Sequence, residues 1–348
     1  MTSAASPNRV AWIDAAKGLG IILIVLGHLA SVEAPSAFYV YIYAFHVPLF
    51  FFISGLTLKP GSKPFGSMLG DKARTLLVPY FCYALLGYAF YLAGYAAARA
   101  AGLSIEQFGY GPWRPLRGVL YGTLGEGRLV NTPMWFVVAL FCTFAIGWLI
   151  NTAVRPVALR WVLVLALAAA GIQASRHVTL PWSLSSALVG LVFFQAGHTH
   201  ARRGRWPSTA GRAALLCVPL LALTLASGLN GFVTLADMVL GHPLLYLVFA
   251  FAGTYATVLL VQALGPGADW LAWLGQRSMA IMVIHMLIIR VVKVGLSAVM
   301  HLPIGQLETQ ALPVALTGVV TAILLVPSVA IMERFLPWTL GKKRRVTA

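Results

Sequence analysis

The first apolar segment of the chain carries two side chains that could do chemistry. Lys17 and His28 are eleven residues apart, which is three α-helical turns to within about 20° and roughly 16 Å of helix axis. A helix here would present an ammonium group and an imidazole on one face, with Asp14 placed to pair with Lys17. A neutral imidazole can take a proton from a hydroxyl group. Alternatively, Asp14 and Lys17 only anchor the segment and His28 is a packed, hydrogen-bonded histidine.

Two further histidines lie inside apolar segments. His46 stands two residues before Pro48, and a proline kinks a helix and frees carbonyl groups, which a bundle tolerates beside a cavity. If the chain turns back near residues 33–36, His28 and His46 fall in the same half of the molecule and could face one space. The other is His285, the third histidine inside an apolar segment after His28 and His46. Each could instead be a structural histidine.

Cations and aromatic residues mark the ends of other apolar segments. Lys72 and Arg74 could join Lys17 in binding the phosphates of an anionic ligand, although cations at such a position are also expected from topology alone. Trp135 opens a later segment, where an aromatic residue commonly marks a membrane interface. Arg290 and Lys293 follow His285 and could either snorkel or attract an anionic sugar or lipid-linked pyrophosphate.

The composition indicates that these segments cross a membrane. Hydrophobic residues make up 59% of the 348 residues and charged residues only 10%, far from the roughly 25% charged residues of soluble domains. The net charge of +16 does not require nucleic acid as a partner, because membrane proteins concentrate cations in cytoplasmic loops. Cys82, Cys142 and Cys217 lack the spacing of a disulfide framework or a metal site, so we expect no metal.

We therefore predict an all-α, polytopic membrane protein with about ten transmembrane helices in one bundle and a single domain over residues 1–348. A retained first helix fits the sequence better than a cleaved signal peptide, because Asp14 and Lys17 interrupt its start. The predicted spans are residues 12–31, 38–58, 75–97, 134–152, 157–174, 183–199, 213–229, 242–263, 279–299 and 311–333.

The distribution of Lys and Arg gives the orientation. With ten spans and both termini in the cytoplasm, 18 of the 25 Lys and Arg residues lie on the cytoplasmic side and 5 on the other, with 2 inside the ninth span. Positive residues favour the cytoplasm. The long segment 98–133 then faces outward and is either a binding element or a surface tether. No P-loop or dinucleotide fingerprint supports nucleotide hydrolysis or dinucleotide binding.

The motifs taken together resemble a known family over nearly the whole chain. The matching stretches are Lys17 and His28 after Trp12-Ile13-Asp14, residues 45–55 (FHVPLFFFISG), the basic segment ending at Pro79-Tyr80, Trp135-Phe136, and residues 274–278 (LGQRS) leading to His285. This pattern resembles the acyltransferase family 3 membrane proteins, in particular fucose and exopolysaccharide O-acetyltransferases. The family often has Arg-x-x-Arg where this chain has Lys72 and Arg74.

The resemblance implies a bacterial inner-membrane enzyme, an O-acyltransferase that moves an acyl group from cytoplasmic acyl-CoA, usually acetyl-CoA, to a hydroxyl of a glycan or lipid-linked saccharide. On this hypothesis Lys17, Lys72 and Arg74 bind the CoA phosphates and His28 is the general base. His46 then orients the acceptor or stabilises the oxyanion. Asp14, Trp135 and His285 are the expected substrate-binding residues. The main alternative is a multi-pass transporter or flippase that uses the histidines as a proton relay.

Overall fold

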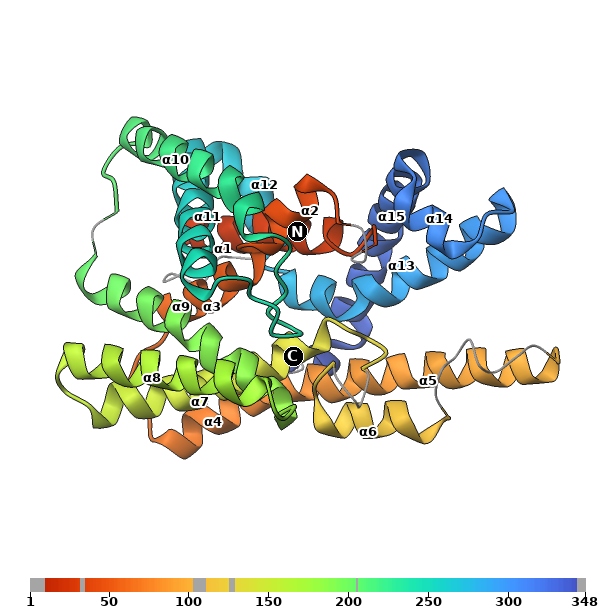
Figure 1. Cartoon of the computed structure of the whole chain (residues 1–348), viewed down its shortest axis with the longest axis horizontal. Helices are drawn as coiled ribbons and strands as arrows, with labels where there is room; N and C mark the ends of the chain where they lie inside the picture. Colours follow the sequence, from red (N-terminus) through yellow and green to blue (C-terminus); the bar gives the residue numbers. More distant parts are fainter. Residues whose placement is uncertain (1–9, 32–34, 103–110, 125–128, 205, 343–348) are drawn as a thin grey trace, which may run out of the picture.

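The computed structural model describes residues 10–31, 35–102, 111–124, 129–204 and 206–342, and its regular elements are helices (Figure 1). In this part of the chain the only extended pairing is an isolated bridge between Thr234 and Val239. The α-helices are α1 (Ala11–Leu26), α2 (Ala37–Tyr43), α3 (His46–Leu56), α4 (Phe65–Lys72), α5 (Val78–Ala100), α6 (Trp113–Tyr121), α7 (Met134–Ala153), α8 (Val157–Ser175), α9 (Leu184–Arg203), α10 (Ala210–Leu225), α11 (Pro243–Leu264), α12 (Asp269–Gly275), α13 (Ser278–Met300), α14 (Ile304–Thr309) and α15 (Ala311–Phe335).

Eight helical stretches of the described residues are long and apolar enough to cross a membrane. They are Ala37–Leu56, Phe65–Ala100, Met134–Ala153, Val157–Ser175, Ala210–Asn230, Pro243–Gly275, Ser278–Met300 and Ala311–Phe335. The protein is thus an all-α, multi-pass membrane protein, as the composition predicted. The predicted spans 12–31 and 183–199 fall on α1, which has 16 residues, and on α9, which ends in a polar turn. The count of ten and the cytoplasmic termini stay predictions.

The second predicted span is broken at Phe45. The chain leaves helical geometry there, with φ −142° and ψ −14°, and α3 restarts at His46. Pro48 lies in the first turn of α3, where a missing N–H leaves no hydrogen bond unmade. The interruption therefore replaces the kink that the sequence predicted at Pro48, and it gives His46 the first position of a new helix.

The third predicted span begins earlier than expected and contains a π-helical segment. Residues Ala73–Leu77 join α4 to α5 with π-helical hydrogen bonds, directly after Lys72. Such bulges insert an extra residue into a helix and commonly occur at functional sites. The segment 98–133, predicted as a long outward loop, contains the short helix α6.

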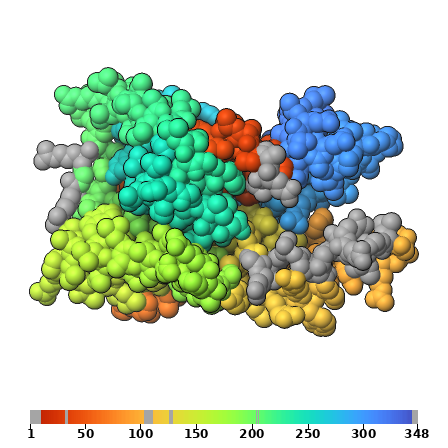
Figure 2. Space-filling view, viewed as in Figure 1, coloured from red at the N-terminus to blue at the C-terminus, as the bar shows by residue number. Residues whose placement is uncertain are grey.

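Helix α1 packs closely on α12 through glycine. A Cβ atom on Gly275 would lie 1.7 Å from the Asp14 carbonyl oxygen, and one on Gly18 would lie 1.9 Å from the Leu271 carbonyl oxygen. The two backbones are therefore in direct contact. Figures 1 and 2 show α13–α15 at one end of the long axis and α8–α10 at the other, with the N-terminal helices in red visible between them. Helix α1 thus runs through the middle of the molecule.

Candidate functional site

A cavity of about 600 Å³ lies beside the end of α1. Its walls come from α1, α3, α7, α13, α14 and the segment of residues 231–242, which we call the 231–242 segment. His28 and His46 both line it, and so does Trp135. The structure therefore brings two of the predicted catalytic histidines and one predicted substrate-binding residue to a single space.

The same kind of hydrogen bond orients His28, His46 and His285. The Nδ1 atoms of His28, His46 and His285 lie 2.7, 2.8 and 3.0 Å from the carbonyl oxygens of the residues four positions earlier. Because a carbonyl oxygen only accepts, Nδ1 carries the proton and donates it. Each Nε2 then keeps a lone pair, which is what a general base requires.

His285 lies behind His28. The two rings meet edge to face with centroids 5.1 Å apart. His285 is completely buried and does not line the cavity, and its Nε2 has no hydrogen-bond partner among the described residues. The contact positions the His28 ring from the side away from the cavity. His285 was predicted to bind substrate, and the structure places it against the His28 ring, outside the cavity lining.

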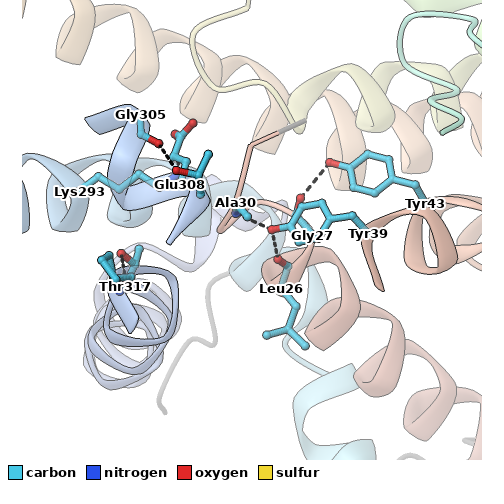
Figure 3. A network of polar contacts seen from close by, with 11 residues as sticks. Leu26, Gly27, Ala30, Tyr39, Tyr43, Lys293, Gly305, Glu308 and Thr317 are labelled. Carbon is cyan, nitrogen blue, oxygen red and sulfur yellow. Dashed lines mark hydrogen bonds and ion pairs between the residues drawn. The ribbon is translucent and has the colours of Figure 1, made fainter. Parts of the chain in front are cut away.

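Two tyrosines on α2 hold the segment that carries His28 (Figure 3). Tyr39 donates to the Leu26 carbonyl oxygen at 2.7 Å and accepts from the Ala30 N–H, while Tyr43 donates to the Gly27 carbonyl oxygen at 2.9 Å. The Tyr43 ring also packs against the His46 ring, with centroids 4.9 Å apart. Sequence reasoning missed both tyrosines, although their i, i+4 spacing puts them on one helix face.

A buried asparagine fixes the wall that contains Trp135. The Asn131 side chain is fully buried and donates to the carbonyl oxygens of Tyr83, at 3.2 Å, and Val283, at 2.8 Å. These bonds join the start of α7 to α5 and α13, so Trp135 is held between rigid elements. Sequence reasoning missed Asn131, because nothing near it in the chain indicates its distant partners.

The predicted anion-binding cations lie elsewhere. Lys17 pairs with the buried Asp14 at 3.4 Å, and the Lys72 ammonium lies 3.5 Å from the centre of the Phe144 ring. The charges of Lys17 and Lys72 are close enough to interact. Arg74 is half-exposed and lies 3.8 Å from Asp71. None of these residues lines the cavity of His28.

A second cavity, of about 510 Å³, lies at the beginning of α1. Trp12 and Ala15 line it together with Trp206, Gln262 and Asp269. Helix α1 therefore has a cavity at each end, and Lys17 lies on the stretch between them. Asp14, which was predicted to bind substrate, contributes to neither cavity.

An ion pair that the sequence did not predict lines the first cavity. Lys293 Nζ lies 2.7 Å from Glu308 Oε1, and both residues line the cavity. Within the described ranges, no three His, Cys, Asp or Glu side chains are grouped so as to hold a metal ion. The lining of the first cavity thus includes imidazoles, aromatic rings and a partly buried ion pair.

Comparisons with known proteins identify the family of the chain. The family Acyl_transf_3, described as an acyltransferase domain, matches residues 10–332. The chain is also 31% identical over 153 residues to nodulation protein NolL of Sinorhizobium fredii, a match that covers 41% of this chain and 37% of NolL. The match thus spans little more than a third of NolL. No solved structure matches the chain. Because the family match covers nearly the whole chain, the protein belongs to the Acyl_transf_3 family of acyltransferases.

Proposed function

We propose that the protein is an O-acyltransferase of the bacterial inner membrane, which moves an acyl group, acetyl in the simplest case, from cytoplasmic acyl-CoA to a hydroxyl of an envelope or exopolysaccharide sugar. The observation that carries this proposal is His28. Its Nδ1 donates to the Ile24 carbonyl oxygen, and its ring lines a cavity of about 600 Å³ in a member of an acyltransferase family.

The chemistry is a single displacement at the thioester carbonyl. The acceptor hydroxyl gives its proton to His28 Nε2 while its oxygen bonds to the acyl carbon. The carbon–sulfur bond then breaks, and the CoA thiolate leaves and is protonated by His28 or by water. His46 also lines the cavity, and its Nε2 can accept a hydrogen bond from a neighbouring hydroxyl of the acceptor sugar.

The cavity lining contains both apolar and polar residues, which suit different substrates. Ile24, Val47, Phe50, Phe136 and Met282 give it an apolar wall, which suits the acyl group and the thioester end of the donor. Trp135 offers a ring face against which a sugar can stack. The lining also carries the Lys293–Glu308 pair, and we assign this polar part to the acceptor.

We assign the CoA phosphates to Lys17, Lys72 and Arg74. Lys17 and Lys72 lie near each other, and their mutual repulsion is relieved when a phosphate binds between them. Asp14 then orients Lys17 rather than touching substrate, since it is buried and paired with it. The donor would extend along α1 toward His28, roughly 16 Å from Lys17.

Replacing Lys72 with methionine should raise the KM for acetyl-CoA by a factor of about 10 or more, because a charge-assisted bond to phosphate is lost. The maximal rate should change little, since Lys72 lies outside the cavity of His28. Lys72→Arg should restore most of the affinity. Lys59→Met removes an exposed cation that precedes α4 and serves as the control. Equal KM values for K59M and K72M would contradict the phosphate assignment.

The direct test of the function uses the purified full-length protein in lipid nanodiscs with labelled acetyl-CoA. We expect release of CoA and appearance of the label on an added glycan. A transporter or flippase would instead move glycan across a reconstituted vesicle membrane without cleaving the thioester. Movement of this kind, together with intact acetyl-CoA, would refute the proposed function.

A further inference from the structure

The ion pair between Lys293 on α13 and Glu308 on α14 is largely removed from solvent. Its Nζ–Oε1 distance is 2.7 Å, and the side chains are only 7% and 30% exposed. Figure 3 shows the pair beside the segment that carries Gly27 and Ala30, at the end of α1. Because both residues line the cavity of His28, their charges face the space that a substrate would enter.

The pair is held in place beside His28. Leu307 is completely buried and anchors α14, and the Glu308 carbonyl oxygen accepts from the Ser31 N–H at 3.1 Å. Ser31 follows His28 by three residues and also lines the cavity. The Lys293 charge lies within electrostatic range of His28. A group bound by the pair would therefore be close to the reactive imidazole.

A second carboxylate lines the same cavity from another element. Asp237 belongs to the 231–242 segment and accepts from the Thr234 hydroxyl at 3.2 Å. The bridge between Thr234 and Val239 closes this segment, and the Ser186 hydroxyl donates to the Leu235 carbonyl oxygen at 2.8 Å. The Asp237 carboxylate is thus presented by a segment that is fixed to α9.

The charges of this wall favour an uncharged ligand. Among the described residues, the ionised groups that line the cavity are one ammonium, Lys293, and two carboxylates, Glu308 and Asp237. Arg290 lies behind them within electrostatic range of Glu308, and it brings the local charge to balance. The sequence left open that Arg290 and Lys293 attract an anionic sugar or pyrophosphate. Because Glu308 already pairs with Lys293, an anionic ligand would meet two carboxylates in the cavity lining. It would find no lining cation left to pair with it.

We propose that Lys293, Glu308 and Asp237 form the acceptor subsite, and that this subsite takes a neutral, polyhydroxylated sugar. The inference rests on the proposed function and specifies its acceptor. Carboxylates accept hydrogen bonds from sugar hydroxyls, and an ammonium donates to a hydroxyl or ring oxygen. A vicinal diol bridging Glu308 and Lys293 would place a neighbouring hydroxyl toward His28.

The test compares methyl β-D-glucuronamide and methyl β-D-glucuronide as acceptors, with the full-length protein and acetyl-CoA. The two sugars carry the same hydroxyl groups and differ at C6, where one has a neutral carboxamide and the other a carboxylate. Wild-type protein should acylate the neutral sugar with a kcat/KM at least about 10 times higher than that for the uronate. In Glu308→Gln the Lys293 charge is unbalanced, so this preference should fall at least about tenfold, through a gain for the uronate. A merely structural role would lower both rates together.

Two variants keep the test independent of folding. Lys293→Met combined with Glu308→Gln removes both charges and should bring back the preference for the neutral sugar. Asp237→Asn alters an exposed side chain and should raise the KM for the neutral sugar by a factor of about 10, because a charge-assisted bond is weakened. Glu333→Gln is the matched control, since Glu333 pairs with Lys342 at 2.6 Å outside the cavity, and it should leave the preference unchanged.

CoA release, measured with each acceptor in turn, separates this inference from the proposed function. Wild-type protein that cleaves acetyl-CoA but prefers the uronate would overturn the subsite and leave the proposed function standing. Equal preferences of the E308Q and E333Q proteins would also overturn the subsite alone. Wild-type protein that does not cleave acetyl-CoA with any acceptor would overturn both.

Discussion

His28→Ala is expected to lower acyl transfer by a factor of about 10²–10⁴, the usual contribution of a positioned general base. The acceptor hydroxyl is a weak nucleophile until its proton is taken, and the His28 Nε2 lone pair is positioned to take it. Transfer is measured with labelled acetyl-CoA in nanodiscs, and the amount of inserted protein is measured in the same membranes. Normal acetylation by inserted H28A protein would refute the role of His28.

Two further variants separate chemistry from packing. His28→Gln keeps a side-chain amide that can donate to the Ile24 carbonyl oxygen, yet has no basic nitrogen, so it should be as inactive as H28A while better preserving the local structure. His177→Ala removes an exposed histidine whose ring contacts Gln173 and should retain wild-type activity. An active H28Q protein would show that acyl transfer does not require the basic nitrogen of His28.

Gly275→Ala is expected to lower the free energy of unfolding by more than about 3 kcal/mol, the range of severe overpacking. The added Cβ would lie 1.7 Å from the Asp14 carbonyl oxygen. Because that neighbour is backbone, the contact is relieved only if α1 and α12 move apart. The measurement is the fraction of protein that remains monodisperse on heating in detergent.

The control for this prediction is Gly295→Ala in α13. A Cβ atom there has no neighbour within 4 Å, and alanine favours a helix by about 1 kcal/mol over glycine. G295A protein should therefore be as stable as wild type or slightly more so. A G275A protein of wild-type stability would mean that the close crossing of α1 and α12 is absent. The path from Lys17 to His28 would then have a different shape.

The sequence predicted the fold class because the bilayer imposes simple rules. Long apolar runs must be helices in hydrocarbon, and each of the eight membrane-length stretches begins or ends within a few residues of a predicted span. The position of the break at Phe45 was not predictable. Pro48 indicates only that the helix is irregular nearby. Helix α1 is short and helix α9 has a polar end. Length and composition therefore do not identify either helix as a membrane span.

Part of the site could also be predicted. His28 and His46 were expected in one half of the molecule, and both line the same cavity. The Lys293–Glu308 pair was not foreseen, because its members are 15 positions apart and the chain turns between them at His301. Asp237 lies in a segment whose position depends on contacts with α9. Polar residues within helical spans can be recognised from the sequence, whereas those brought in by connecting segments require the tertiary structure.

The central claim is that acyl transfer takes place in the cavity of His28. An experimental structure of the protein with a thioether analogue of acetyl-CoA, which cannot be cleaved, tests it most directly. We expect the acyl carbonyl carbon inside the cavity, roughly 4–6 Å from His28 Nε2, a separation that leaves room for one hydroxyl oxygen between them. An analogue whose acyl end lies outside this cavity, with His28 out of reach, would contradict the account.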